Sequence, residues 1–212
     1  MRLFAIYATS ITCGFCLMAL EILGARVLYP SFGSSIDVWA AIITVFILSL
    51  SIGYVIGGRI ADRSTNNRPL AWIVLGSGIL YLTLPIYALR VSEALGDAMG
   101  QMRFGVLVAG LVLFLLPSLL LGMISPVLVK LVFVSAERVG RTTGMLYAVG
   151  SVGNVFGILV TDYILLEHVR INSNLLWMGG LLCVTGLLHL AIRMQASAEQ
   201  QPAVPVAPSQ GA

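Results

Sequence analysis

The sequence is short of charge. Only 10% of its 212 residues are Asp, Glu, Lys or Arg, whereas 58% are hydrophobic. A soluble domain carries about 25% charged residues, so a chain this apolar could not cover its surface in water. The shortage excludes a soluble globular protein and predicts that the lipid bilayer is the solvent.

Lysine, cysteine and histidine are also scarce. Lys130 is the only lysine, and the net charge of +3 comes from scattered arginines, which excludes a nucleic-acid-binding surface. Three cysteines give no disulfide framework, and Cys13 and Cys16, a C-x-x-C pair in an apolar run, are predicted to be buried thiols rather than a redox pair. His168 and His189 have no second ligand at metal spacing. We therefore expect neither a metal nor a cofactor.

What the sequence does contain is long apolar runs. A helix needs about 20 apolar residues to cross ~30 Å of hydrocarbon. Six runs qualify, over about residues 3–27, 36–60, 70–89, 104–133, 142–166 and 175–192. The predicted fold is therefore an all-α integral membrane domain of six transmembrane helices over residues 1–194. The Pro/Ala/Gln-rich residues 195–212 are predicted to form a disordered cytoplasmic tail.

The basic residues predict the orientation of this domain. With a cytoplasmic N-terminus, eight Lys and Arg residues fall on the inner side and four on the outer side. Cytoplasmic loops carry an excess of basic residues. We therefore expect a multi-pass protein of the cell's inner (cytoplasmic) membrane, with both termini in the cytoplasm.

The loop after the second apolar run carries a family resemblance. Residues 58–70, GRIADRSTNNRPL, resemble the loop between the second and third helices of major facilitator superfamily transporters. The residues that fit its signature are Gly58, Asp62, Arg63 and Leu70. Residues 65–67, Thr-Asn-Asn, stand where that family has a Gly and two basic residues.

A closer resemblance is to the membrane half of fused facilitator/spermidine-synthase-like proteins. There a helix ending in an acidic residue leads through an Arg and a P-x-F-G-S-S turn into a Gly-rich helix. The matching residues are Glu21, Arg26, Pro30, Phe32, Gly33, Ser34, Ser35, Gly53, Gly57, Gly58, Asp62 and Arg63, and residues 116–128 and 140–157 agree as well. The resemblance implies two three-helix repeats, which together make half of a major facilitator transporter.

The synthase half of those relatives has no counterpart here. The chain ends at Ala212 and has no strand, Gly-rich loop and helix in succession. We therefore expect no aminopropyltransferase domain and no enzyme activity.

Acidic residues in the spans are the first candidates for function, because charge is costly in a bilayer. At about 1.5 Å per residue, Glu21 and Asp162 lie near the outer ends of their helices. Asp37 lies at the same level, at the outer start of the second helix. With nearby aromatic rings these acids could bind an organic cation through ion pairs and cation–π contacts. The substrate-binding candidates are Glu21, Asp37, Asp162, Tyr29, Trp39 and Tyr163. The alternative is that they are interfacial residues, paired with outer arginines beside an aromatic belt.

Charged residues also gather in the inner loops. The resemblance implies that Asp62 engages arginines across this surface and latches the two three-helix units together. The latch candidates are Arg59, Asp62, Arg63, Arg138 and Arg141. The alternative is that these charges only set the topology and bind lipid headgroups.

Two glycine pairs have helix-packing spacing. Gly53 and Gly57, and likewise Gly153 and Gly157, are four residues apart, which lets helix backbones approach closely. We predict that they pack helices within the domain. The alternative is a rocking or dimer interface.

Two functions follow as hypotheses. Half a facilitator needs a second half, so the first is a homodimeric carrier or conduit for small organic cations. The resemblance implies that these cations are polyamine-like. The second is a non-catalytic membrane anchor or accessory subunit of a separate synthase-like enzyme or larger membrane complex. Scarce polar residues in the bilayer core favour the second; those expected near mid-depth are Thr44, Ser49, Ser51 and Asn154.

Overall fold

The computed structural model describes residues 2–64, 66–99, 103–132 and 139–192. In chain order the elements are α1 (Arg2–Phe32), α2 (Ile36–Arg63), α3 (Arg68–Met99), α4 (Arg103–Val132), α5 (Val139–Val160), η2 (Thr161–Leu165), α6 (Leu166–His168) and α7 (Ile171–Ala191). Six helical segments are long and apolar enough to cross a membrane, the fifth being the continuous α5–η2–α6. The predicted all-α, six-span fold is confirmed.

Several helices extend beyond the apolar runs that predicted them. The third span, predicted to end near residue 89, continues to Met99 through Arg90, Glu93 and Asp97. The charges end the apolar run but not the helix, because Arg, Glu and the intervening Ala and Leu favour helix. α1 likewise reaches Phe32 rather than residue 27, and includes Pro30.

The fifth span is interrupted by one π-helical turn. Residues Thr161–Leu165 form η2, and the helix then resumes as α6 and ends at His168. Such π-helical turns inside α-helices are rare and frequently occur at functional sites. Here the π turn carries Asp162, one of the predicted acids.

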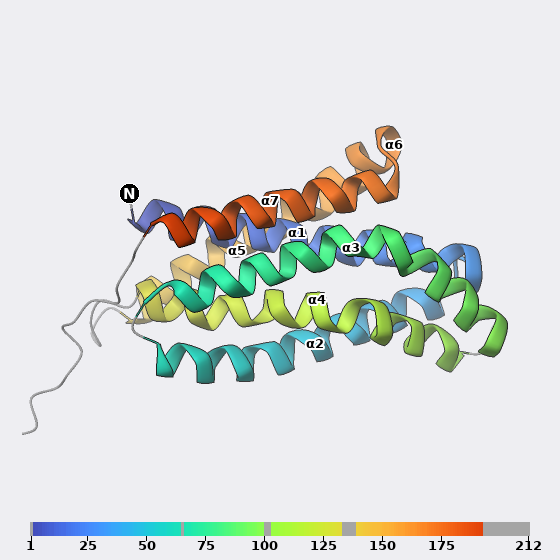
Figure 1. Ribbon diagram of the computed structural model, residues 1–212, viewed down its shortest axis with the longest axis horizontal. Coiled ribbons are helices and arrows are strands. Elements are labelled where there is room, and N and C mark those ends of the chain that lie inside the picture. The colour runs from blue at the N-terminus through green and yellow to red at the C-terminus, as the bar shows by residue number, and fades with distance from the viewer. Residues whose placement is uncertain (1, 65, 100–102, 133–138, 193–212) are drawn as a thin grey trace, which may run out of the picture.

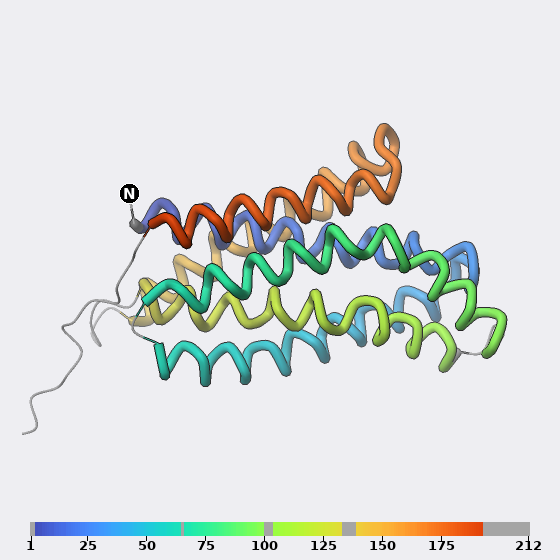
Figure 2. Tube along the Cα trace, viewed as in Figure 1, coloured from blue at the N-terminus to red at the C-terminus, as the bar shows by residue number. Residues whose placement is uncertain are grey.

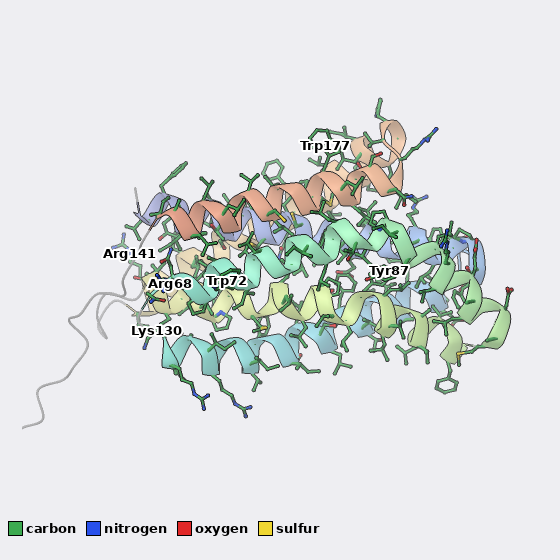
Figure 3. The ribbon with its side chains drawn as sticks, in the orientation of Figure 1. Arg68, Trp72, Tyr87, Lys130, Arg141 and Trp177 are labelled. Carbon is green, nitrogen blue, oxygen red and sulfur yellow. The ribbon has the colours of Figure 1, made fainter. Side chains whose placement is uncertain are left out.

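All six spans run along the long axis of the molecule, in alternating directions (Figure 2). The start of α1 and the end of α7 lie at the same end of the bundle (Figure 1). Figure 3 places Arg68, Lys130 and Arg141 at that end. We call it the arginine-rich end, defined by Arg59, Arg63, Arg68, Lys130 and Arg141.

The packing of the spans has an internal symmetry. The most extensive contacts join α2 to α4, α3 to α7, and α1 to α5. Suppose that each of the first three spans is exchanged with the span three places later: α1 with α4, α2 with α5, and α3 with α7. The α2–α4 contact then becomes the α5–α1 contact, and the α3–α7 contact is unchanged. This is the pattern expected of two three-helix repeats with inverted topology.

The correspondence holds residue by residue at the two glycine crossings. Adding 100 to the residue number of each α2 glycine gives the equivalent glycine of α5; we call this the step of 100 residues. Adding 108 to the number of each α1 residue that an α5 glycine contacts gives the α4 residue that the equivalent α2 glycine contacts; we call this the step of 108. The equivalent contacts are Gly53–Leu119 with Gly153–Ile11, and Gly57–Met123 with Gly157–Phe15. Both crossings therefore have the same packing geometry.

At both crossings the two helix backbones are in direct contact. A Cβ atom added to Gly57 would lie 2.7 Å from the Cα of Met123 and 2.8 Å from the Cγ of Pro126. A Cβ on Gly157 would lie 2.9 Å from the Cα of Phe15. Without side chains between them, the helices approach closely enough for dispersion contacts along both backbones.

Hydrogen bonds fasten the arginine-rich end. Asn67, which is only 2% exposed, donates from Nδ2 to the carbonyl oxygens of His189 and Ile192, both at 2.7 Å. The last carbonyls of a helix have no partner within it, so Asn67 caps α7 from the α2–α3 connection. The hydroxyl of Thr9 lies 2.7 Å from Nε2 of His189 and ties α1 to the same place.

The first prediction concerns the glycine crossings. Gly57→Val should destabilise the folded domain by about 1–3 kcal/mol, the usual range for overpacking, because the new side chain meets the backbone of α4. Gly58→Val is the matched control, since nothing lies within 4 Å of a Cβ at Gly58. Thermal unfolding in detergent measures the difference, and equal losses for the two variants would contradict the close crossing.

The second prediction concerns the cap on α7. Asn67→Ala should lower the free energy of unfolding by about 1–3 kcal/mol, because it leaves buried carbonyls without donors. Asn66→Ala is the control, since the Asn66 side chain accepts one 3.2 Å bond from the backbone N–H of Arg68. Unfolding by a denaturing detergent measures both variants, and a neutral Asn67→Ala would disprove the cap.

Candidate functional site

At the opposite end of the bundle, one arginine connects two of the predicted site residues. Nη2 of Arg26 lies 3.7 Å from Oδ1 of Asp162, and its guanidinium lies 5.7 Å from the ring centroid of Tyr29. Both charged side chains are nearly half exposed, at 46% and 45%. This arrangement is the interfacial pairing that the sequence offered as the alternative to a cation site.

The other predicted substrate-binding residues lie apart from this pair. Glu21 is partly buried in α1, and Asp37 lies in the first turn of α2. Trp39 packs against the core, whereas Tyr163 is 67% exposed on η2. None of them, nor Asp162 or Tyr29, lines either of the two cavities described next.

A cavity of about 210 Å³ lies between α1, α2, α4 and α5. We call it the central cavity. Six aliphatic side chains form part of its wall. Its hydroxyl and amide groups come from Ser10, Tyr54, Ser125, Tyr147, Ser151 and Asn154.

The helices position these polar groups by simple spacing. On α5, Tyr147, Ser151 and Asn154 follow one another at i, i+4 and i+7, so they share one face. Gly14 of α1 makes room for this face, because a Cβ there would lie 2.7 Å from Oδ1 of Asn154. Gly150 does the same for Ser10, whose Oγ would be 2.9 Å from a Cβ on that glycine.

A second cavity, of about 310 Å³, lies at the arginine-rich end. We call it the end cavity. Asp62 of α2 and Lys130 of α4 both line it, together with Tyr147 of α5. Tyr147 also lines the central cavity, so the two cavities adjoin at this side chain.

The central cavity is lined by equivalent positions of the two repeats. Tyr54 and Asn154 are related by the step of 100 residues that relates the glycine pairs, and Leu17 and Ser125 by the step of 108. The cavity therefore lies where the repeats meet. Transporters built from inverted repeats have their substrate sites at such an interface.

The latch candidates lie at the arginine-rich end, but the structure does not join them. Arg59, Arg63 and Arg141 are exposed, and Asp62 lines the end cavity beside Lys130. In the part of the chain that the structure describes, no ion pair links Asp62 to any of these three arginines. Arg138, the remaining candidate, lies outside the described residues.

The polar residues predicted near mid-depth divide into two kinds. The hydroxyls of Thr44, Ser49 and Ser51 each donate to a carbonyl four residues earlier, at 2.6–2.8 Å. The hydrogen-bond donors of these hydroxyls are therefore satisfied within α2. Asn154 instead lines the central cavity.

The comparisons with known proteins found no match: no protein-family model, no curated protein and no solved structure resembles the chain. The resemblance to the membrane half of fused facilitator/spermidine-synthase-like proteins therefore stays a prediction. Among the described residues, no group of three His, Cys, Asp or Glu is placed to hold a metal.

The sequence interpretation missed most of the cavity-lining residues. Ser10, Tyr54, Ser125 and Ser151 are single polar residues in apolar runs, and each looks unremarkable alone. Two signals could have revealed them. One is the stripe of polar residues on residues 147–154, and the other is the step of 100 residues that relates Tyr54 to Asn154.

The third prediction tests whether water reaches the central cavity. In a variant lacking Cys13, Cys16 and Cys183, Tyr147→Cys should react with a charged, membrane-impermeant maleimide added from the side of the arginine-rich end. Val155→Cys should not, because Val155 lies on the exposed apolar face of α5 and lines neither cavity. Labelling rates in intact vesicles measure this, and labelling of Tyr147→Cys as slow as that of Val155→Cys would show that water does not reach the side chain at which the two cavities adjoin.

Proposed function

We propose that this polytopic membrane protein is a carrier or conduit for a small polar solute, with the central cavity as its binding site. The observation that carries the proposal is the convergence of six hydroxyl and amide side chains on one hollow inside the spans. Polar groups are scarce in this chain and costly in lipid. Binding sites combine an apolar wall with a few convergent polar groups, as this cavity does.

The end cavity is the route by which the solute reaches the central cavity in this proposal. It adjoins the central cavity at Tyr147, which makes the aromatic side chain the natural barrier between them. Solute enters from the arginine-rich end, which the distribution of basic residues predicts to be cytoplasmic. In this proposal α2 and α5 move against α4 and α1 at the glycine crossings, where helix backbone lies against helix backbone.

A second copy of the chain completes the carrier in this proposal. In the most apolar stretch of the α5–η2–α6 span, 17% of the residues are buried within one chain, whereas in the corresponding stretches of the other five spans the share is 39–50%. Tyr54 and Tyr147 at the cavity are 47% and 55% exposed. Lipid tails offer these hydroxyls no hydrogen bond, so a symmetric partner over α2 and α5 is favoured over bare lipid.

The hypothesis of a polyamine-like cation at the opposite end remains a separate prediction. Asp162 there is paired with Arg26, which weakens its attraction for a cationic solute. Glu21 is then the residue on which that hypothesis depends. Its removal distinguishes the two sites.

The second candidate function is a membrane anchor or accessory subunit. The observation that favours it is the row of exposed arginines at the arginine-rich end: Arg59, Arg63, Arg68 and Arg141. Such a surface fits an acidic protein surface, such as that of a separate synthase-like enzyme, through charge complementarity. In this role the cavities have no solute to carry.

The fourth prediction separates these functions. Purified protein in liposomes should move labelled erythritol or labelled 1,4-diaminobutane faster than protein-free liposomes do, and Asn154→Leu should slow that flux at least five-fold. Ser51→Ala is the matched control, because Ser51 is related to Ser151 by the step of 100 residues but lines neither cavity. Size-exclusion profiles establish that both variants fold.

Other results assign the function elsewhere. Flux that falls with Glu21→Gln and not with Asn154→Leu places the site among the acids of the opposite end. Absence of flux, together with a stoichiometric partner protein after gentle purification, supports the anchor and contradicts the carrier.

A further inference from the structure

Among the residues that the structure describes, five of the six polar side chains of the central cavity are unpaired, and the sixth, Ser10, donates from Oγ to the carbonyl oxygen of Leu146 at 3.4 Å. In the described chain, the hydroxyls of Tyr54, Ser125, Tyr147 and Ser151 and the amide of Asn154 have no recorded hydrogen-bond partner, although they converge on one space. The hydroxyls of Ser49 and Ser77, by contrast, bond to their own helices, whereas Ser118 and Thr161 are single buried hydroxyls without a partner in the described residues that line neither cavity. Side chains of this kind each donate and accept, so the cavity can bind a solute through several hydrogen bonds at once.

Charge is missing from the same lining. No Asp, Glu, Lys, Arg or His lines the central cavity among the described residues. A charged solute leaving water for a site walled by aliphatic side chains needs a counter-charge to replace its hydration. On the route in, Asp62 and Lys130 share the end cavity with opposite formal charges, so that cavity adds no net charge.

We propose that the central cavity selects small uncharged solutes rich in hydroxyl groups, and that it rejects organic cations. This inference rests on the proposed function, since it names the substrate class of the same site. The volume of about 210 Å³ equals roughly seven water molecules at ~30 Å³ each. A polyol of four carbons fits within that volume.

The lining also fits the shape of such a solute. Three of the polar groups follow one face of α5, and Asn154 among them offers both a carbonyl and an NH₂ group. Adjacent hydroxyls of a polyol can therefore donate to and accept from one side chain. The aliphatic residues Leu17, Leu121 and Leu128, supplied by α1 and α4, provide contact for the C–H surface of the same molecule.

The test compares erythritol with 1,4-diaminobutane, which share a four-carbon chain and differ in charge. In proteoliposomes of the full chain, the protein-dependent flux of erythritol should exceed that of the diamine at least ten-fold. Asn154→Asp, nearly isosteric, introduces the missing counter-charge and should reverse this preference. Glu93→Gln is the control, because it removes an exposed carboxylate that lines neither cavity, and should leave the preference unchanged.

The outcomes separate the ligand class from the proposed function. If the wild-type protein moves the diamine as fast as erythritol, and Asn154→Leu slows both, the site stands and the ligand class is overturned. An Asn154→Asp variant that folds but keeps the preference for erythritol also overturns it; Ser151→Asp repeats the test if Asn154→Asp does not fold. If neither solute crosses faster than in protein-free liposomes, the proposed function fails together with the ligand class.

Discussion

The close contact of helix backbones at two equivalent crossings is the constraint on which the rest of this structure depends. Between α2 and α4, and between α5 and α1, glycines remove the side chains that would hold the helices apart. Lipid supplies no hydrophobic drive for association, so helices in a bilayer are held by such packing. Fixing these two pairs sets the distance between α1, α2, α4 and α5, and thereby the hollow that they enclose.

The bilayer also explains how polar side chains are distributed in the domain. Isolated hydroxyls, such as those of Thr44 and Ser51, bond to a carbonyl of their own helix and present no polar group to lipid. The polar residues of the central cavity do not follow this rule, because Tyr54 and Asn154 have no recorded partner in the described chain. Their convergence on one space with an apolar wall is the feature that fits a bound solute.

The charged residues described at the two ends of the bundle have different partners. Arg26 holds Asp162 and covers Tyr29 at the opposite end, while Asp62 and Lys130 share the end cavity. Asn67, which departs from the facilitator-type signature, has a structural role of its own, because its amide caps α7. A short neutral side chain suits that buried position better than a long basic one.

The sequence by itself determined the six spans, their approximate limits and the glycine pairs, because hydrophobic length and G-x-x-x-G spacing are local properties of one helix. It could not determine which helix each glycine touches, nor that Ser10, Tyr54, Ser125 and Asn154 surround one cavity, because these residues come from four different spans. It likewise left open whether Asp162 binds a cation or an arginine. Only the tertiary structure decided these points, because helix pairing in lipid depends on the fit of complete surfaces, and that fit brings together residues more than 100 positions apart.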